Sequence, residues 1–191
     1  QVNTNKIYDH AQLILKDKID RQKSKGLLER PIRTMILGIP NVGKSTLINA
    51  LSGKKATKVG NKPGVTKAQQ WIKLGENFEL LDTPGVLWPK FEDQKVGYHL
   101  AITGAIKDNI IPIDDVCYYA LNFLKTHYPK RLLDKYDIPF DMTDYVEMLD
   151  QIGKNRGALL KGAEIDYDRV YHIILTDIRN KALGGLSFDR Q

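Results

Sequence analysis

The sequence has one cysteine and no apolar run near the 18 residues that a membrane-spanning helix needs. A single cysteine cannot form an internal disulfide, which excludes a small fold held together by disulfides. Cys117 lies in the apolar helical pattern DDVCYYALNFL, where we expect a buried hydrophobic residue in a reducing cytoplasm. Residues 1–30 are polar and charged and show no secretory signal. We therefore expect a cytoplasmic protein that has no membrane partner.

Hydrophobic residues make up 42% of the 191 residues, which is enough for a packed core. Lys and Arg number 29 against 23 Asp and Glu, so the formal net charge is +6. A basic surface favours polyanionic partners, although a modest lysine excess can also serve only solubility. The chain begins with glutamine rather than methionine, which suggests a fragment of a longer protein.

The apolar pattern divides the chain into an α/β part and a helical part. Apolar residues at helical spacing predict an amphipathic helix over 5–25, with Gly26 as its stop signal. The run RTMILGI (33–39) predicts a buried parallel strand. The other predicted elements are strands at 69–74 and 77–82, and helices at 44–51, 113–128 and 166–183. We expect an α/β nucleotide core over 1–110 and a C-terminal helical domain over 111–191.

GIPNVGKST (38–46) has the Gly-x-x-x-x-Gly-Lys-[Ser/Thr] spacing of a phosphate-binding loop, which serves ATPases, GTPases and small-molecule kinases alike. A glycine-rich turn between a strand and a helix presents backbone N–H groups to phosphate oxygens. We expect Lys44 to reach the β- and γ-phosphates and the hydroxyl of Ser45 to hold magnesium. The loop residues expected to bind the nucleotide are Pro40, Asn41, Val42, Gly43, Lys44, Ser45 and Thr46.

The motif DTPG (82–85) directly follows the last predicted strand of the core. Ligands of α/β sheets collect at the carboxyl ends of strands, where the Asp82 carboxylate can hold magnesium through water. The alternative is a carboxylate that only caps the next turn. Gly85 has no Cβ, so its backbone N–H can approach the γ-phosphate closely. We therefore expect Gly85 to contact the nucleotide.

The loop between these motifs, 53–67, is rich in Lys, Gly, Thr and Pro. A threonine there can coordinate magnesium through its hydroxyl and donate its backbone N–H to the γ-phosphate. Thr57 and Thr66 both qualify, and the residues alone do not choose between them. Loops of this kind are ordered by the triphosphate and released after hydrolysis, which makes a switch.

Four motifs, GIPNVGKST, NKPGVT, DTPGVLWPKFED and TGAIKD, resemble the ribosome biogenesis GTPase A group of circularly permuted GTPases. The resemblance covers nearly the whole chain and implies a phosphate-loop core followed by a helical, RNA-contacting domain. It implies GTP and GDP as the nucleotides, Thr66 as the switch threonine, and a potassium ion coordinated by Asn41. The alternative for Asn41 is a turn residue that bonds its own backbone. The expected magnesium set is then Ser45, Thr66 and Asp82, and the expected catalytic residues are Lys44, Thr66 and Gly85.

Two parts of the usual GTPase pattern are missing. The guanine-reading motif Asn-Lys-x-Asp has no match after Asp82. The permuted group places this motif before the phosphate loop, but the residues preceding Gly38 contain no match either. Val86 stands where many GTPases have the glutamine that orients the attacking water. The group is thought to use an upstream histidine instead, which has no match here. The resemblance therefore implies slow intrinsic turnover and a chain that lacks the upstream half.

We expect a monomeric GTPase that assembles the large ribosomal subunit, contacts its rRNA and switches with the nucleotide state. An alternative from another class is a nucleotide-gated rRNA-binding module with negligible catalysis. A small-molecule kinase is a third possibility, against which DTPG argues. RNA contacts are expected at basic residues of the helical domain, namely Lys154, Arg156, Lys161, Arg169, Arg179 and Lys181. Trp88 and Phe91 are either partner anchors or fold back on the core.

Overall fold

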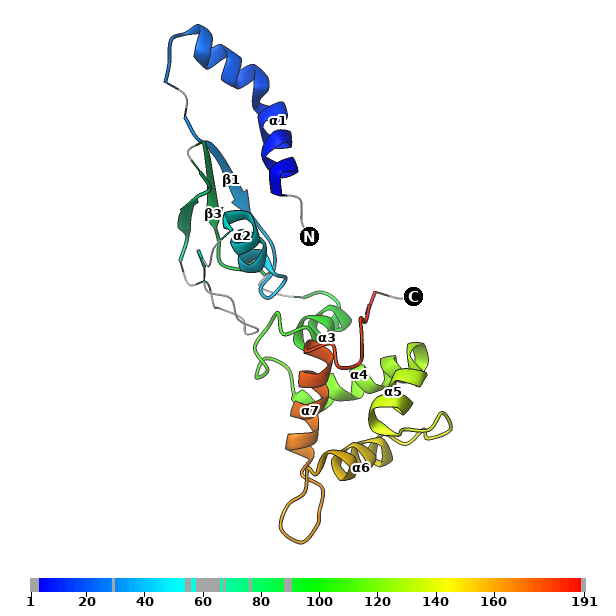
Figure 1. Cartoon of the computed structure of the whole chain (residues 1–191). Helices are drawn as coiled ribbons and strands as arrows, with labels where there is room; N and C mark the ends of the chain where they lie inside the picture. Colours follow the sequence, from blue (N-terminus) through cyan, green and yellow to red (C-terminus); the bar gives the residue numbers. More distant parts are fainter. Residues whose placement is uncertain are drawn as a thin grey trace. The chain divides into compact units, whose positions relative to one another are not determined.

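The computed structural model of the chain describes residues 4–28, 30–53, 56, 57, 66, 68–75, 77–87 and 91–189 (Figure 1). The chain forms two compact units, residues 1–87 and 88–191. The boundary expected near residue 110 differs from this division, because α3 (Gln94–Ile102) packs against α4 and α7 of the second unit. The predicted α/β core and helical part are both present, which confirms the fold class.

The first unit contains a sheet of three described strands, β1 (Ile32–Ile36), β2 (Gln70–Lys73) and β3 (Phe78–Asp82), in the order β1-β3-β2. β1 is parallel to β3, with Ile36 opposite Asp82, and β2 is antiparallel to β3. The parallel register brings the carboxyl end of β1 and the carboxyl end of β3 to the same edge. The phosphate loop and the DTPG motif therefore start side by side.

Helix α2 (Lys44–Ser52) covers one face of this sheet. Its Ile48 forms a buried core with Ile72 of β2 and Leu80 of β3. Side chains alternate along a strand, so Met35 lies on the opposite face, where 51% of it is exposed. The prediction that this segment forms a parallel strand is confirmed by β1. The prediction that the strand is buried is wrong for the face of β1 that carries Met35.

Helix α1 (Thr4–Ser24) matches the predicted amphipathic helix, and Gly26 follows it with a left-handed φ of +68°. Tyr8 packs edge-on against Phe78 of the sheet, with ring centroids 5.7 Å apart. Ile14, one of the apolar residues at helical spacing in this segment, is 81% exposed. Within the described part of the chain, no helix is both long and apolar enough to cross a membrane.

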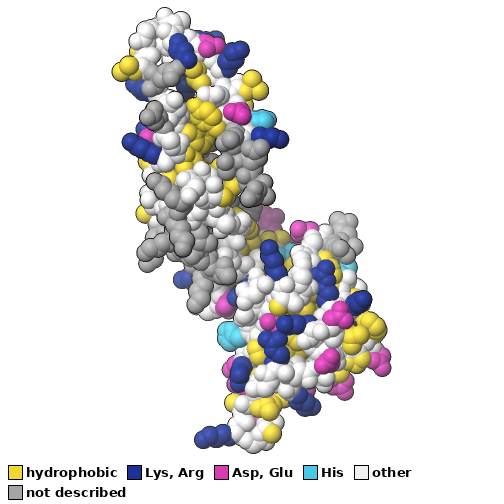
Figure 2. Space-filling model, in the orientation of Figure 1, with side chains coloured by type: hydrophobic (Ala, Val, Ile, Leu, Met, Phe, Trp, Pro, Cys, Tyr) yellow, Lys and Arg dark blue, Asp and Glu magenta, His cyan; other side chains and the backbone are white. Residues whose placement is uncertain are grey.

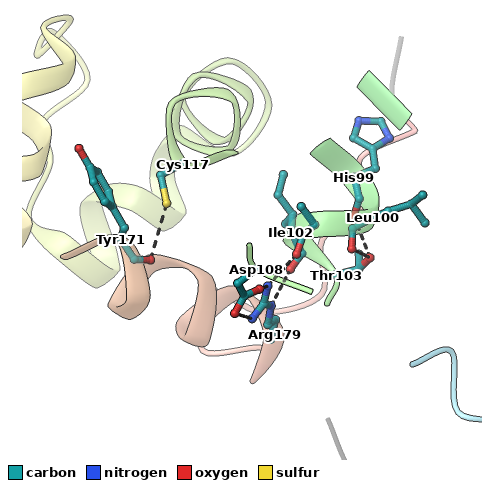
Figure 3. A network of polar contacts seen from close by, with 9 residues as sticks. His99, Leu100, Ile102, Thr103, Asp108, Cys117, Tyr171 and Arg179 are labelled. Carbon is teal, nitrogen blue, oxygen red and sulfur yellow. Dashed lines mark hydrogen bonds and ion pairs between the residues drawn. The ribbon is translucent and has the colours of Figure 1, made fainter. Parts of the chain in front are cut away.

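The second unit is a helical bundle of α3, α4 (Ile113–His127), α5 (Pro129–Tyr136), α6 (Tyr145–Arg156) and α7 (Tyr167–Arg179). Its core is apolar, and α4 packs against α3, α5 and α7. Cys117 on α4 is fully buried, and its thiol donates to the carbonyl oxygen of Tyr171 at 3.6 Å (Figure 3). Burial raises the pKa of Cys117 to about 12. The expectation that Cys117 is a buried residue is confirmed.

Candidate functional site

The phosphate loop joins the end of β1 to the start of α2. Asn41 and Gly43 both adopt left-handed backbone conformations, with φ of +62° and +93°. Asparagine and glycine are the residues that reach this region at least cost. Gly43 is the N-cap of α2 and has no side chain to occupy the helix N-terminus. The loop therefore leaves the start of a nine-residue helix open to an anion.

Lys44 lies over this loop. Its Nζ donates to the carbonyl oxygens of Gly38 at 3.0 Å and Ile39 at 2.8 Å. Burial lowers the pKa of Lys44 from its ordinary value, and the negative charge of Asp82 acts in the opposite direction. The ammonium group is thus held at the loop, close to the carboxylate that ends β3.

Asp82 is 2% exposed, and its Oδ1 is buried without a hydrogen-bond partner among the described residues. Burial raises the pKa of Asp82, against the combined effect of the Lys44 charge and hydrogen bonds from Thr83 and Thr66. A buried carboxylate oxygen without a partner is costly unless a cation or donor reaches it. This oxygen therefore fits a site that a metal ion completes.

Two hydroxyls lie next to this carboxylate. Oγ of Ser45, in the first turn of α2, is 3.3 Å from Oγ1 of Thr66. Thr66 also hydrogen-bonds to Asp82. Ser45, Thr66 and Asp82 come from three separate segments and converge on one point. Three oxygen ligands of this kind suit magnesium, which completes its shell with water and phosphate oxygens.

Thr57, the other candidate threonine, has a different position. Oδ1 of Asn49 accepts from the Thr57 N–H at 2.8 Å, and Nδ2 of Asn49 donates to the Thr57 carbonyl at 3.0 Å. The Thr57 hydroxyl is directed at the backbone of α2, 3.2 Å from the carbonyl oxygen of Ser45. Of the two threonines, it is Thr66 whose hydroxyl contacts both Ser45 and Asp82. Sequence reasoning missed Asn49, although it lies four residues after Ser45 and hence on the same helix face.

The DTPG segment packs directly on the phosphate loop. A Cβ added to Gly85 would lie 2.5 Å from the backbone nitrogen of Pro40 and 2.6 Å from its Cα. The backbone N–H of Val86 donates to the Gly38 carbonyl at 3.1 Å. The hydroxyl of the buried Thr83 donates to the Ile36 carbonyl at 2.6 Å. Glycine at 85 therefore permits a close backbone approach to Pro40 that the sequence did not reveal.

Not every expected site residue lies in this cluster. Val42 is 57% exposed at the tip of the loop, and Thr46 is exposed on the first turn of α2. Trp88 lies outside the described residues. Phe91 is partly buried, and its Cδ2 lies 3.8 Å from the position that a Cβ on Gly97 of α3 would take. Phe91 thus lies against α3.

Three of the arginines expected to contact RNA are used inside the helical unit. Nη1 of Arg156 pairs with the buried Asp177 at 2.8 Å. The guanidinium of Arg179 pairs with Asp108 at 2.6 Å and donates to the carbonyl oxygens of Ala101 and Ile102 (Figure 3). Arg169 donates to the carbonyl of Gly157 at 3.0 Å. The charges of these arginines hold helix ends together.

Residues 33–153, more than half of the chain, match the family model described as 50S ribosome-binding GTPase. The chain belongs to this family. Among the curated members it resembles, ribosome biogenesis GTPase A of Bacillus pumilus is 53% identical over 186 residues, which is 97% of this chain and 66% of that protein. The probable ribosome biogenesis GTPase A of Mycoplasma pneumoniae is 35% identical over 93% of this chain and 64% of its own length.

Solved structures agree with this membership of the 50S ribosome-binding GTPase family. The crystal structure of GNP-bound YlqF from T. maritima has a TM-score of 0.60 and 26% identity over 94% of this chain and 65% of that chain. The GDP-bound structure of the same protein has a TM-score of 0.56 at 25% identity. The resemblance inferred from the motifs is confirmed. The chain spans just under two thirds of the length of these relatives.

Proposed function

We propose that this chain holds the phosphate site and the switches of a GTPase that acts in assembly of the large ribosomal subunit. One observation carries the proposal: Ser45, Thr66 and the buried Asp82 converge beside a phosphate loop whose lysine is already in place. The named relatives, which are ribosome biogenesis GTPases, support the ribosomal part of the proposal.

In this proposal the N-terminus of α2 and the loop N–H groups bind the β-phosphate, and Lys44 neutralises the β- and γ-phosphates. Ser45 and Thr66 would hold magnesium through their hydroxyls, and the Asp82 carboxylate would complete the ligand set. The bound ion supplies positive charge to the β- and γ-phosphate oxygens. Asn41 is the residue that the family resemblance points to for potassium.

Switching would rest on Thr66 and Gly85. Thr66 contacts Ser45 and Asp82 through its side chain, so departure of the γ-phosphate and magnesium would remove further contacts that favour this position. Gly85 lies against Pro40, and Val86 is bonded to the Gly38 carbonyl. A γ-phosphate that accepts a hydrogen bond from the Gly85 N–H would therefore act where the DTPG segment packs on the phosphate loop.

Hydrolysis by this chain alone should be slow. Val86, at the position where many GTPases carry a glutamine, is 63% exposed and has no polar group to orient water. We expect an intrinsic rate on the order of 10⁻⁴ s⁻¹, as for unassisted Ras-type sites. Acceleration would come from the large ribosomal subunit. The same observation on Val86 favours the second candidate, a nucleotide-gated rRNA-binding module without appreciable catalysis.

The proposal is tested by titrating the chain with fluorescent GTP and ATP analogues, in potassium and in sodium, with and without large ribosomal subunits. Lys44→Ala is the variant that should lose triphosphate binding. Selective GTP binding with turnover that the subunit stimulates is the expected result. GTP-dependent binding to the subunit without stimulated turnover would favour the second candidate. A preference for ATP would overturn the GTPase assignment.

A further inference from the structure

The residues that follow α7 lie along the helical bundle without forming a helix or strand. Residues 183–189, which we call the strap, are drawn in red beside α3 and α4 in Figure 1. Leu183 is buried, but Gly184 and Gly185 are exposed, and Gly184 has a left-handed φ of +78°. Glycine loses more conformational entropy than any other residue when it becomes ordered. The strap is therefore easier to release than the packed helices of this unit.

The side chains of Arg131 and Tyr128 bind the backbone of the strap. The Arg131 guanidinium donates to the carbonyl oxygen of Leu183 at 3.0 Å and also to that of Gly185. Its Cζ lies 4.6 Å from the centroid of the Tyr128 ring, and the Tyr128 hydroxyl accepts from the Ser187 N–H at 3.0 Å. An arginine that stacks on an aromatic ring keeps its N–H groups aimed in one direction, which suits the oxygens of a phosphate.

The aromatic ring of the strap extends a row of rings on the bundle. Tyr98 of α3 stacks on Tyr119 of α4 with centroids 5.0 Å apart, and Tyr119 stacks on Phe123 at 6.3 Å. Phe188 of the strap lies 4.8 Å from Phe123 and 5.8 Å from His99, centroid to centroid. Nucleobases stack on aromatic side chains of this kind whatever their sequence. The Phe188 ring thus holds a place that a base would fit.

The surroundings of this site carry exposed charges of both signs. Lys130 precedes Arg131 on α5, and Lys95 lies four residues before His99 on the same face of α3. Asp134, also exposed, lies one turn after Lys130. Figure 2 shows Lys and Arg side chains interspersed with Asp and Glu on the face of this unit in view. Charge alone therefore does not locate a phosphate site here, whereas the stacked arginine beside the aromatic row does.

We propose that Phe123, Tyr128 and Arg131 form a binding site for an unpaired RNA strand, and that the strap covers this site until RNA displaces it. The strap carbonyl oxygens at Arg131 stand in for phosphate oxygens, and the Phe188 ring stands in for a base. The inference rests on the proposed function, since it takes ribosomal RNA as the ligand. It adds where in the helical unit an unpaired strand binds and which segment competes with it. Because both use one surface, the closed strap lowers the apparent affinity for RNA.

The test removes one phenyl ring at a time from the full chain. Phe188→Ala loosens the strap and leaves the site intact. Phe123→Ala is added to Phe188→Ala, so that the strap is loosened in both proteins and the second lacks only the platform. Phe140→Ala is the matched control, because Phe140 is 61% exposed in the same unit and belongs to neither the strap nor the aromatic row.

Binding of a labelled oligouridylate of about ten nucleotides is measured by fluorescence anisotropy at a fixed salt concentration of about 50 mM, beside an RNA duplex of the same length. The melting temperature and the affinity for a fluorescent GDP analogue are measured for every protein. Hydrogen exchange of residues 183–189 is followed in the parent with and without the oligonucleotide.

Phe188→Ala should bind the oligonucleotide about three- to tenfold more tightly than the parent, because its site is open in a larger fraction of molecules. Adding Phe123→Ala should then weaken binding by about 5- to 100-fold through the lost stacking. The control should bind like the parent, and RNA should speed hydrogen exchange in the strap.

A Phe188→Ala variant that binds the oligonucleotide no more tightly than the parent would overturn the proposal. So would an equal gain in affinity for the duplex, or slower exchange in the strap when RNA is bound. Each of these results, with guanine nucleotide binding intact, would leave the proposed GTPase function standing. The expected RNA results in a parent that binds no guanine nucleotide would refute the GTPase function alone.

Discussion

Asn49 and Thr57 are joined by two reciprocal hydrogen bonds, one from the backbone N–H of Thr57 to the Asn49 side chain and one from that side chain to the Thr57 carbonyl. Asn49 lies one turn after Ser45 on α2. The amide side chain thus ties the early part of the switch loop to the helix that carries the proposed magnesium ligand. We expect the Asn49–Thr57 pair to limit the positions that Thr66, later in the same loop, can occupy.

Asn49→Ala should therefore weaken binding of a triphosphate analogue by about 5- to 30-fold, because it removes the two hydrogen bonds to the Thr57 backbone, of about 0.5 to 1 kcal/mol each. Diphosphate binding should change less than about threefold. The measurement is a fluorescence titration with both nucleotides. Ser52→Ala, three residues further along α2, is the control. Equal losses of affinity for the two nucleotides would show that Asn49 only supports the fold of α2.

Thr66→Ala should spare diphosphate binding and weaken the magnesium-dependent binding of the triphosphate. Its hydroxyl meets Ser45 and Asp82, which are the other oxygen ligands of the proposed site. Thr57→Ser keeps the hydroxyl that bonds to α2 and serves as the control. Titrations with and without magnesium distinguish a loss of magnesium-dependent binding from a general loss of nucleotide binding. A Thr66→Ala variant that loses affinity for both nucleotides equally would contradict the switch assignment.

Asp82→Asn should lose magnesium-dependent binding without loss of stability. Burial raises the pKa of Asp82, so the folded protein holds a proton at pH values where the unfolded chain has released it. Stability of the nucleotide-free protein then falls as pH rises from the ordinary value of 3.8 through the raised pKa. At pH 7 the amide removes that cost, and triphosphate affinity should fall by about 10- to 100-fold.

Thermal unfolding at pH 7 without nucleotide should give Asp82→Asn a melting temperature equal to or above that of the parent. At pH values below the ordinary pKa the difference should vanish, because both side chains are then neutral. A variant that melts earlier at pH 7 would show that attraction to Lys44 outweighs desolvation.

Gly85→Ala should disrupt the packing of the DTPG segment on the phosphate loop. Its Cβ would meet the backbone of Pro40 at 2.5 Å, so one of the two segments must move, at a cost of about 1 to 3 kcal/mol. Nucleotide affinity and melting temperature should both decrease. Pro40→Ala should not fully rescue the variant, because it removes the ring Cγ at 2.6 Å but leaves the backbone nitrogen at 2.5 Å and Cα at 2.6 Å. Full rescue would place the clash in the proline ring instead.

Local sequence patterns predicted those parts of the fold that depend on neighbouring residues. The phosphate loop, α1, α2, α4, α7 and the strands all lie within a few residues of their predicted positions. Helical spacing, a glycine turn and a short apolar run each act over one element, so the sequence reveals them directly. The convergence of Lys44 and Asp82 also followed, because the carboxyl ends of parallel strands meet.

Pairings between distant residues were not predictable in this way. The partners of Arg156 and Arg179 lie 21 and 71 residues away, and an arginine within a pair looks in sequence like one on the surface. The exposure of Met35 depends on which sheet face α2 covers. The close approach of Gly85 to Pro40 depends on how two loops fold over a strand edge. These outcomes follow from tertiary packing rather than from spacing.

Cys117 gives the helical unit a built-in reporter. It is the only thiol of the chain, and it is buried between α4 and the carbonyl of Tyr171 on α7. The thiolate is the form that attacks an alkylating reagent, and a pKa raised to about 12 leaves almost no thiolate at neutral pH. Alkylation therefore has to wait until α7 moves away from α4. The rate of alkylation, followed by mass spectrometry on unlabelled protein, would report how often α7 separates from α4, with and without ribosomal subunits.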